Sequence, residues 1–135
     1  MIPMREFDLE IVTPDGVLYS DKAESLLVRT TDGDVEILAG HVEYMASLGT
    51  GRARIKAGGK DRLAAVSGGF LTVSEGKVRL VAVTFEFGDM IDLERAKLAR
   101  QRAEEAVKRA EDKKALTAAK ARLMRALARI SAHEG

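Results

Sequence analysis

Cysteine is absent from the 135-residue sequence, so disulfide bonds, thiolate metal ligands and thiol catalysis are excluded together. Tryptophan is also absent and aromatic residues make up only 4%, so any core must be built mainly from Val, Leu, Ile and Ala. Few aromatics leave little to stack on nucleic-acid bases, and we expect no nucleic-acid partner. With His41 and His133 as the only histidines, we predict no metal-ligating residues.

Long apolar runs are also missing. No run approaches the roughly 20 residues that a transmembrane helix needs, so we expect no membrane-spanning segment. Residues 1–10 contain acidic side chains and lack the basic start and apolar middle of a signal peptide. A hydrophobic fraction of 46% with a charged fraction of 32% is typical of a soluble folded chain. We therefore expect a cytosolic, bacterial setting.

Glycine and proline are absent from residues 89–134, whereas ten of the twelve glycines and both prolines lie before residue 88. Ala, Leu, Arg, Lys and Glu dominate the later segment, and these residues favour helix. The composition therefore predicts two domains: a β-strand domain over residues 1–87 and a helical domain over residues 88–135.

Apolar residues recur at spacings of three and four in each half of the helical segment, which gives each half one apolar stripe. The first stripe is mostly alanine: Leu93, Ala96, Ala99, Ala103, Ala106 and Ala110. The second stripe is mostly leucine: Leu116, Ala119, Leu123, Leu127 and Ile130. Small residues facing large ones allow close approach, which favours an antiparallel two-helix hairpin.

The break between the two helices is expected at residues 111–114, where charged residues replace the apolar pattern and Asp112 can cap a second helix. Because this break contains neither Gly nor Pro, nothing in it forbids a continuous helix. The hairpin can be static, or it can open into one rod that offers its stripes to a partner, and the sequence leaves both open.

Short segments of alternating polarity, separated by glycine turns, fill residues 4–84. Phe7, Leu9 and Ile11 alternate with acidic residues, a pattern typical of a half-buried strand. Tight turns are expected at Pro14-Asp15-Gly16, Asp32-Gly33, Gly58-Gly59 and Glu75-Gly76. Ser67-Gly68-Gly69 is expected to connect strands at 63–66 and 70–73 with dihedrals that only glycine adopts freely. Eight or more short strands favour a sandwich or flattened barrel.

Candidates for catalysis in the strand domain are few. His41 follows Gly40 in an expected loop, and we interpret it as a turn or packing residue. Ser67 lacks the Gly-x-Ser-x-Gly order and the strand-to-helix context of a nucleophile turn. No lysine follows as in a phosphate-binding loop. We therefore predict no catalytic residues.

The net charge of +1 is unevenly spread. Residues 1–87 carry ten basic and thirteen acidic side chains, whereas residues 88–135 carry twelve and eight. Within the second expected helix, Arg122, Arg125 and Arg129 are three and four residues apart and share one side. Such an arginine cluster suits a phosphate group, and a solvated basic face is the alternative.

Two arginines of the first expected helix, Arg95 and Arg102, are seven residues apart and also share one side. Folding the hairpin can bring both arginine-bearing sides together. That approach is repulsive unless an anion lies between them or the carboxylates of Asp92 and Glu104 intervene.

Three stretches in this order resemble the epsilon subunit of bacterial F-type ATP synthase: Gly40-His41, the segment VSGGFLTV at 66–73, and IDLERA at 91–96 before an alanine-rich tail. The resemblance covers essentially the whole chain and implies a β-sandwich of about ten strands followed by a two-helix hairpin. It implies a non-catalytic subunit that contacts the gamma subunit of the central stalk and the c-ring. It further implies coupling of rotation to proton or sodium flow, at the cytoplasmic face of the bacterial membrane.

The helical tail of such subunits can fold onto the sandwich or extend toward the alpha and beta subunits, where it inhibits ATP hydrolysis. Some bacterial members bind ATP in the folded hairpin through an Ile-Asp-x-x-Arg-Ala motif and further arginines. Carried over to this sequence, the resemblance implies ATP, with or without Mg2+, as a regulatory ligand of Glu86, Ile91, Asp92, Arg95, Ala96, Arg102, Arg125 and Arg129. The arginines would meet phosphates, and the carboxylates would accept from the base amine or the ribose hydroxyls.

Three positions near His41 depart from the family pattern: Glu36, Ala39 and Glu43 stand where glycine, proline and proline are usual. The geometry of this loop is therefore not predicted. A freestanding ATP-sensing module without a rotary partner is the alternative function. An enzyme using Glu86 or Asp92 as a base is disfavoured, because neither a nucleophile nor a metal cluster accompanies them.

Overall fold

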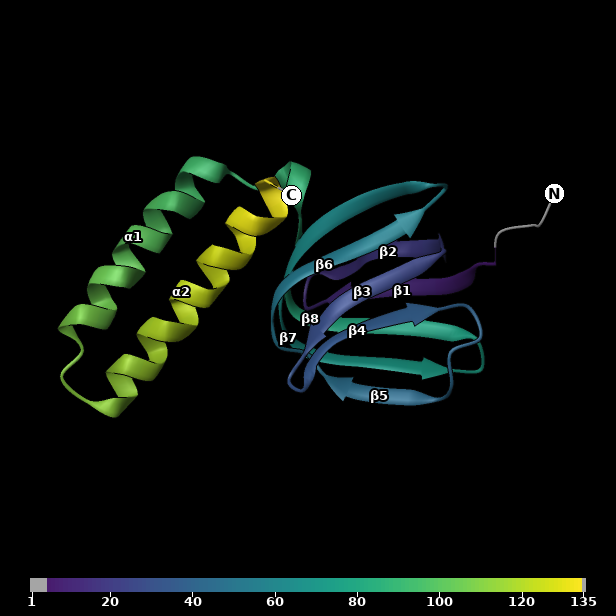
Figure 1. Cartoon of the computed structure of the whole chain (residues 1–135), viewed down its shortest axis with the longest axis horizontal. Helices are drawn as coiled ribbons and strands as arrows, with labels where there is room; N and C mark the ends of the chain where they lie inside the picture. The colour runs from purple at the N-terminus through teal and green to yellow at the C-terminus, as the bar shows by residue number, and fades with distance from the viewer. Residues whose placement is uncertain (1–4, 135) are drawn as a thin grey trace.

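A computed structural model describes residues 5–134 and places a β-sandwich beside a two-helix hairpin (Figure 1). The strands are β1 (Phe7–Thr13), β2 (Gly16–Ala23), β3 (Ser25–Thr30), β4 (Gly33–Leu38), β5 (Tyr44–Ser47), β6 (Thr50–Ala57), β7 (Lys60–Ser74) and β8 (Lys77–Phe87). After them come η1 (Gly88–Met90), α1 (Leu93–Arg109) and α2 (Lys113–Glu134). The predicted fold class is confirmed, with eight strands in the described chain rather than about ten.

The strand ladder runs in the order β2-β1-β8-β7-β6-β3-β4, and β5 pairs with β7. All neighbours are antiparallel except β1 and β8, which are parallel. The ladder folds over itself, so its inner faces bury a common core of aliphatic side chains. The largest fully buried members are Leu9, Ile11, Leu26, Val28, Ile37, Ile55, Leu71 and Leu80. The alternation of buried and outward residues in β1 confirms the half-buried strand expected there.

The lower strand count has a physical reason in β7. The segments 63–66 and 70–73, expected as separate strands, are the two halves of this one strand. Gly68 and Gly69 have φ angles of 69° and 100°, yet β7 pairs with β8 in one register on both sides of them. On its other edge β7 pairs with β6 up to Ser67 and with β5 from Phe70. The glycine pair therefore marks a change of neighbour within a strand, and the expected connection between two strands is wrong.

The three residues near His41 that depart from the family pattern have different surroundings. The carboxylate of Glu43 accepts a hydrogen bond from the backbone N–H of Glu75 at 3.0 Å, which ties this loop to the β7–β8 turn. Ala39 packs against the sandwich core, and Glu36 lies exposed in β4. The ring of His41 meets that of Tyr44 edge-on at 5.4 Å, which agrees with its interpretation as a packing residue.

A side-chain cap marks the start of each helix of the hairpin. Asp112 accepts from the N–H of Ala115 at 2.7 Å and so begins α2, as expected for the break at 111–114. Asp92 accepts from the N–H of Arg95 at 3.1 Å and begins α1. Both caps satisfy N–H groups that the first turn of a helix leaves without a partner.

The contact between the helices differs from the prediction. The side chains buried there are alanines from both helices: Ala96 and Ala103 of α1, and Ala119 and Ala126 of α2, all at most 3% exposed. Leu127 of the expected stripe is 40% exposed, so the prediction that it packs against the alanines of α1 is wrong, and Leu123 is only half-buried. Alanine at seven-residue spacing on both sides lets the two backbones approach closely.

The C-terminal half of α2 packs on the sandwich, so α2 lies between α1 and the strands in Figure 1. Ala128, Ile130 and Ala132 are buried in a small cluster with Ala65 of β7 and Ile91. Gly88 makes the close approach possible, because a Cβ at this position would collide with the carbonyl of Ala132. One end of α2 is therefore anchored to the sandwich by apolar contacts.

Candidate functional site

The candidate site begins where β8 passes into α1. In β8 the side chains of Phe85 and Phe87 are buried, so the alternation of the strand leaves Glu86 between them facing outward. Ile91 is buried after the short turn of η1, and Asp92 caps α1. This junction presents two carboxylates, Glu86 and Asp92, on the side where α2 lies.

A cavity of about 550 Å³ lies between this junction and the two helices. Seven of the eight predicted ligand residues line it: Glu86, Ile91, Asp92, Arg95, Ala96, Arg102 and Arg129. The eighth, Arg125, lines an adjoining cavity of about 280 Å³ that shares Ala99, Arg102 and Arg129 with the first. The first volume falls in the range of small-molecule sites, and the second lies just below that range. Residues far apart in the sequence are thus brought together by folding of the hairpin.

An ion pair crosses the first cavity. Nε of Arg129 donates to Oε1 of Glu86 at 2.6 Å, which links α2 to the last strand of the sandwich. Both side chains are partly buried, at 35% and 40% exposed. Partial burial reduces solvent screening, so this pair contributes more than an exposed surface pair.

The second carboxylate expected between the arginines has another partner. Glu104 accepts from Nε of Arg100 one turn earlier in α1, at 2.7 Å, and does not line either cavity. Glu86 is therefore the carboxylate that offsets the arginines of α2. Asp92 retains one carboxylate oxygen beyond the one that caps α1.

Five residues that line the cavities were not among the eight predicted ligand residues, and one of them is Ala103 of the second cavity. Met90, Leu98 and Ala99 line the first cavity and add apolar surface against which a planar base can lie. Arg122 joins Arg125 and Arg129 in the second cavity. The three-and-four spacing of these arginines had indicated that Arg122 shares their side of α2, and this spacing was the available signal.

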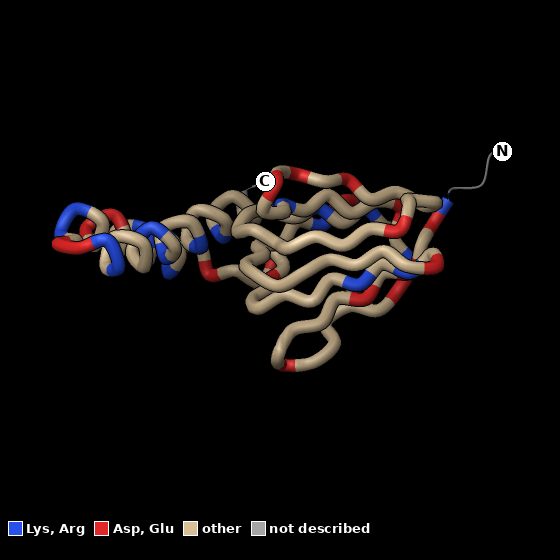
Figure 2. Tube along the Cα trace, turned by 90° about the horizontal axis from the view of Figure 1, so that it is seen from below, with Lys and Arg blue, Asp and Glu red and all other residues tan. Residues whose placement is uncertain are grey.

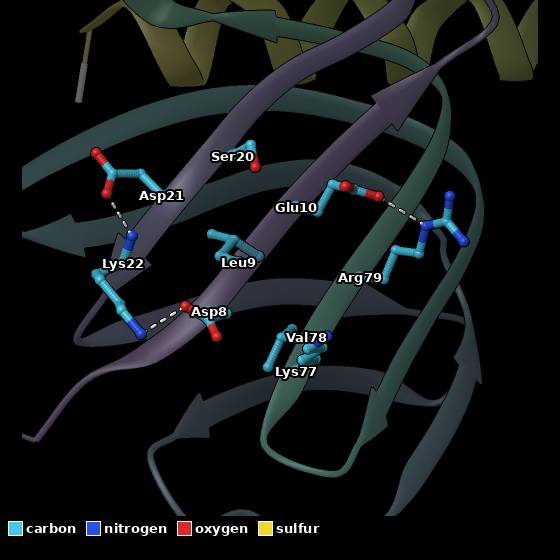
Figure 3. Close-up of a pocket in the computed structure, with 9 residues that line it drawn as sticks. All are labelled: Asp8, Leu9, Glu10, Ser20, Asp21, Lys22, Lys77, Val78 and Arg79. Atoms are coloured by element: carbon cyan, nitrogen blue, oxygen red, sulfur yellow. Dashed lines mark hydrogen bonds and ion pairs between the residues drawn. The ribbon is translucent and has the colours of Figure 1, made fainter.

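Another hollow, of about 580 Å³, lies on the outer face of β1, β2 and β8 (Figure 3). Four of its six charged side chains form ion pairs: Lys22 pairs with Asp8 at 2.6 Å, and Arg79 pairs with Glu10 at 2.9 Å. The hydrogen bond from Lys22 holds the pKa of Asp8 below its ordinary value. A ligand here would have to break these pairs, so the hollow is a weaker candidate than the cavity beside the helices.

Nothing in the described chain resembles a catalytic centre. The hydroxyl of Ser67 lies 3.0 Å from that of Thr50 within a strand pair, without a histidine beside it. Among the described residues there is no group of three His, Cys, Asp or Glu side chains that could hold a metal ion. None of the described helices is long and apolar enough to cross a membrane.

Two family models match consecutive parts of the chain, and the boundary between them lies at the end of the sandwich. The family model "ATP synthase, Delta/Epsilon chain, beta-sandwich domain" matches residues 6–88, and "ATP synthase, Delta/Epsilon chain, long alpha-helix domain" matches residues 89–134. The chain belongs to the ATP synthase delta/epsilon chain family. The epsilon chain of this family is a non-catalytic subunit, which confirms that prediction.

Similar epsilon chains come from several bacteria. The ATP synthase epsilon chain of Bacillus velezensis is 40% identical over 127 residues, which cover 94% of this chain and 96% of that protein. That of Bacillus subtilis is 43% identical over 102 residues, covering 76% and 77% of the two chains. A chain of the Euglena gracilis mitochondrial ATP synthase, solved as OSCP/F1/c-ring, has the same fold, with a TM-score of 0.84 at 23% identity. It covers 100% of this chain, which covers 84% of that one.

Proposed function

We propose that this delta/epsilon family member is the epsilon subunit of a bacterial ATP synthase central stalk. In this proposal the sandwich contacts the gamma subunit and the c-ring at the cytoplasmic face of the membrane, and so takes part in ion-driven ATP synthesis. Support comes from the epsilon chains that match nearly the full length of this chain. A second fold neighbour, from Tetrahymena thermophila, was solved as mitochondrial ATP synthase central stalk/c-ring, with a TM-score of 0.66. Co-purification with gamma distinguishes this role from a freestanding ATP sensor.

ATP is the ligand that we propose for the cavity beside the helices. The carrying observation is that Arg95 and Arg102 of α1 and Arg129 of α2 line one cavity with Glu86 and Asp92. Guanidinium groups bind phosphate oxygens through charge-assisted hydrogen bonds, and carboxylates accept from ribose hydroxyls or a base amine. The exposed apolar side chains of Met90 and Leu98 supply a surface for the base.

Binding at this cavity selects the folded hairpin. Its lining comes from β8, α1 and α2, so opening the hairpin separates the two arginine-bearing sides and removes the site. A ligand that binds only one state shifts the population toward that state. The opened helices are then the form that extends toward the alpha and beta subunits and inhibits ATP hydrolysis. The turn between α1 and α2, at 110–112, has neither Gly nor Pro that would prevent continuous helix.

Titration of the isolated subunit with ATP tests the ligand. Because the chain has no cysteine, paired labels can be placed at Gln101→Cys in α1 and Ala121→Cys in α2, both exposed. We expect ATP to raise the fraction of molecules with a short distance between the labels. The two sites lie roughly 30 Å apart in a continuous helix, whereas packed helix axes are about 10 Å apart. Calorimetry without measurable binding at millimolar ATP would rule out the proposed ligand.

Removal of residues 89–135 tests inhibition. The remaining sandwich has its own core, so we expect it to unfold cooperatively and to assemble with gamma. The complex should hydrolyse ATP faster than one with the full chain, most clearly at low ATP, where the hairpin is least occupied. Equal hydrolysis rates at low ATP would contradict an inhibitory tail, and loss of cooperative unfolding would contradict the independence of the sandwich.

A further inference from the structure

Arg122 is part of the arginine cluster of α2, yet the proposed ATP site does not use it. It lies one helical turn before Arg125, on the same side of α2, and lines the cavity of about 280 Å³. This cavity is lined by alanines and arginines alone: Ala99, Arg102, Ala103, Arg122, Arg125 and Arg129.

The two connected cavities have opposite chemical character. The larger one, next to the sandwich, includes the carboxylates of Glu86 and Asp92, which repel phosphate and attract hydrogen-bond donors. The smaller one, farther along the hairpin, is lined by four guanidinium groups and no carboxylate. A nucleotide in the site is therefore oriented, with its nucleoside near the sandwich and its phosphates extending toward the middle of the hairpin.

Arg122 is the residue of α2 in this cavity that lies farthest from Glu86. At 1.5 Å per residue, its Cα is roughly 10 Å along the helix from that of Arg129. No carboxylate lies within ion-pair distance of Arg122 in the described part of the chain, whereas Arg129 is held by Glu86. Its guanidinium is exposed and also borders the hollow at the helix turn, which leaves it able to reach the far end of a phosphate chain.

We propose that Arg122 binds the terminal phosphate of a nucleoside triphosphate and so makes the site selective for the triphosphate over the diphosphate. The inference rests on the proposed function, because it requires a nucleotide in the adjoining cavity. Arg95, Arg102, Arg125 and Arg129 meet the phosphates nearer the nucleoside. Contact with Arg122 then fixes the outer part of the hairpin, which the diphosphate does not reach.

Calorimetric titration of the full chain with MgATP and with MgADP tests this assignment. In Arg122→Ala we expect ATP affinity to fall at least about tenfold, the loss of one charge-assisted contact, while ADP affinity stays unchanged. Lys120→Ala is the matched control, because Lys120 lies on the same helix, carries the same charge and is exposed outside both cavities. It should leave both affinities unchanged. Circular dichroism checks that each variant keeps its helix content.

The possible results separate the two proposals. If wild type binds ATP and Arg122→Ala binds it equally well, Arg122 belongs to a solvated basic face and the assignment is wrong. An equal loss for ATP and ADP would also overturn it, since Arg122 would then act on both nucleotides alike. Wild type that binds neither nucleotide would instead overturn the proposed function, and this inference with it.

Discussion

Replacing Arg125 and Arg129 together with alanine is expected to lower ATP affinity more than tenfold while the sandwich, which keeps its own core, still unfolds cooperatively. Each arginine supplies a charge-assisted contact of roughly 1.5–3 kcal/mol. Loss of Arg129 also leaves the carboxylate of Glu86 without its partner at the cavity wall, where it repels phosphate. The two losses share one site and need not add.

The control for this double variant is Lys113→Ala with Lys114→Ala. These lysines begin α2 at the far end of the hairpin, so the change removes the same charge from the same helix without touching either cavity. Calorimetry should show ATP affinity near that of wild type in the control. Equal ATP affinity in wild type and the double arginine variant would leave the arginines as a solvated face or as contacts to acidic partners.

Gly69→Ala is expected to destabilise the sandwich by about 3 kcal/mol or more, the range of severe core substitutions. A Cβ at Gly69 would collide with the backbone carbonyl of Val81 in the neighbouring strand, and the φ of 100° disfavours any L side chain. Backbone on both sides is held by the β7–β8 ladder and cannot shift freely. Urea unfolding of the full chain measures the loss as a lower midpoint.

Gly16→Ala separates the two contributions at Gly69. Gly16 has a φ of 117°, but a Cβ there would meet nothing within 4 Å. Only the dihedral cost applies, and we expect about 1 kcal/mol. If both variants lost the same stability, the contact with Val81 would have no energetic weight.

Local patterns in the sequence were sufficient for much of the fold. Alternation in β1, paired glycines at Gly58 and Gly59, and the capping side chain of Asp112 each depend on neighbours within a few residues. The composition change at residue 88 coincides with the boundary between the two matching family models. Such features are set by backbone geometry and short-range hydrogen bonds, so they can be read without a structure.

Features that depend on a third element could not be predicted in the same way. The leucine stripe of α2 was expected to face α1, but α2 also packs on β6 and β7, and its orientation satisfies both neighbours. In sequence, Gly68-Gly69 has the composition of a turn. Only the pairing of β7 with β5, β6 and β8 shows that the strand continues through these two glycines. Glu104 was expected to lie between the arginines of the two helices, but it pairs with Arg100 of its own helix, and only the geometry of α1 shows this.

The candidate site was located by resemblance rather than by local pattern. Glu86 and Arg129 are separated by 43 positions, and no spacing rule joins them. The helical spacing of the arginines did predict which side of α2 they share, and the cavities lie on that side. Apolar cavity residues such as Leu98 carry no signal in sequence, because an exposed leucine on a helix is ordinary.

The alanine contact between α1 and α2 determines how strongly the fraction of closed hairpin would depend on the concentration of a ligand that binds between the helices. Each methylene that is not buried forgoes about 0.8 kcal/mol, so the four buried alanines contribute less to the contact between the helices than four buried leucines would. A ligand at a hundred times its dissociation constant stabilises the state it binds by about 2.7 kcal/mol. Against a leucine interface that amount would leave the closed fraction almost unchanged. If the hairpin opens as proposed, the same amount would shift the closed fraction further across an alanine contact, because less free energy holds the two helices together.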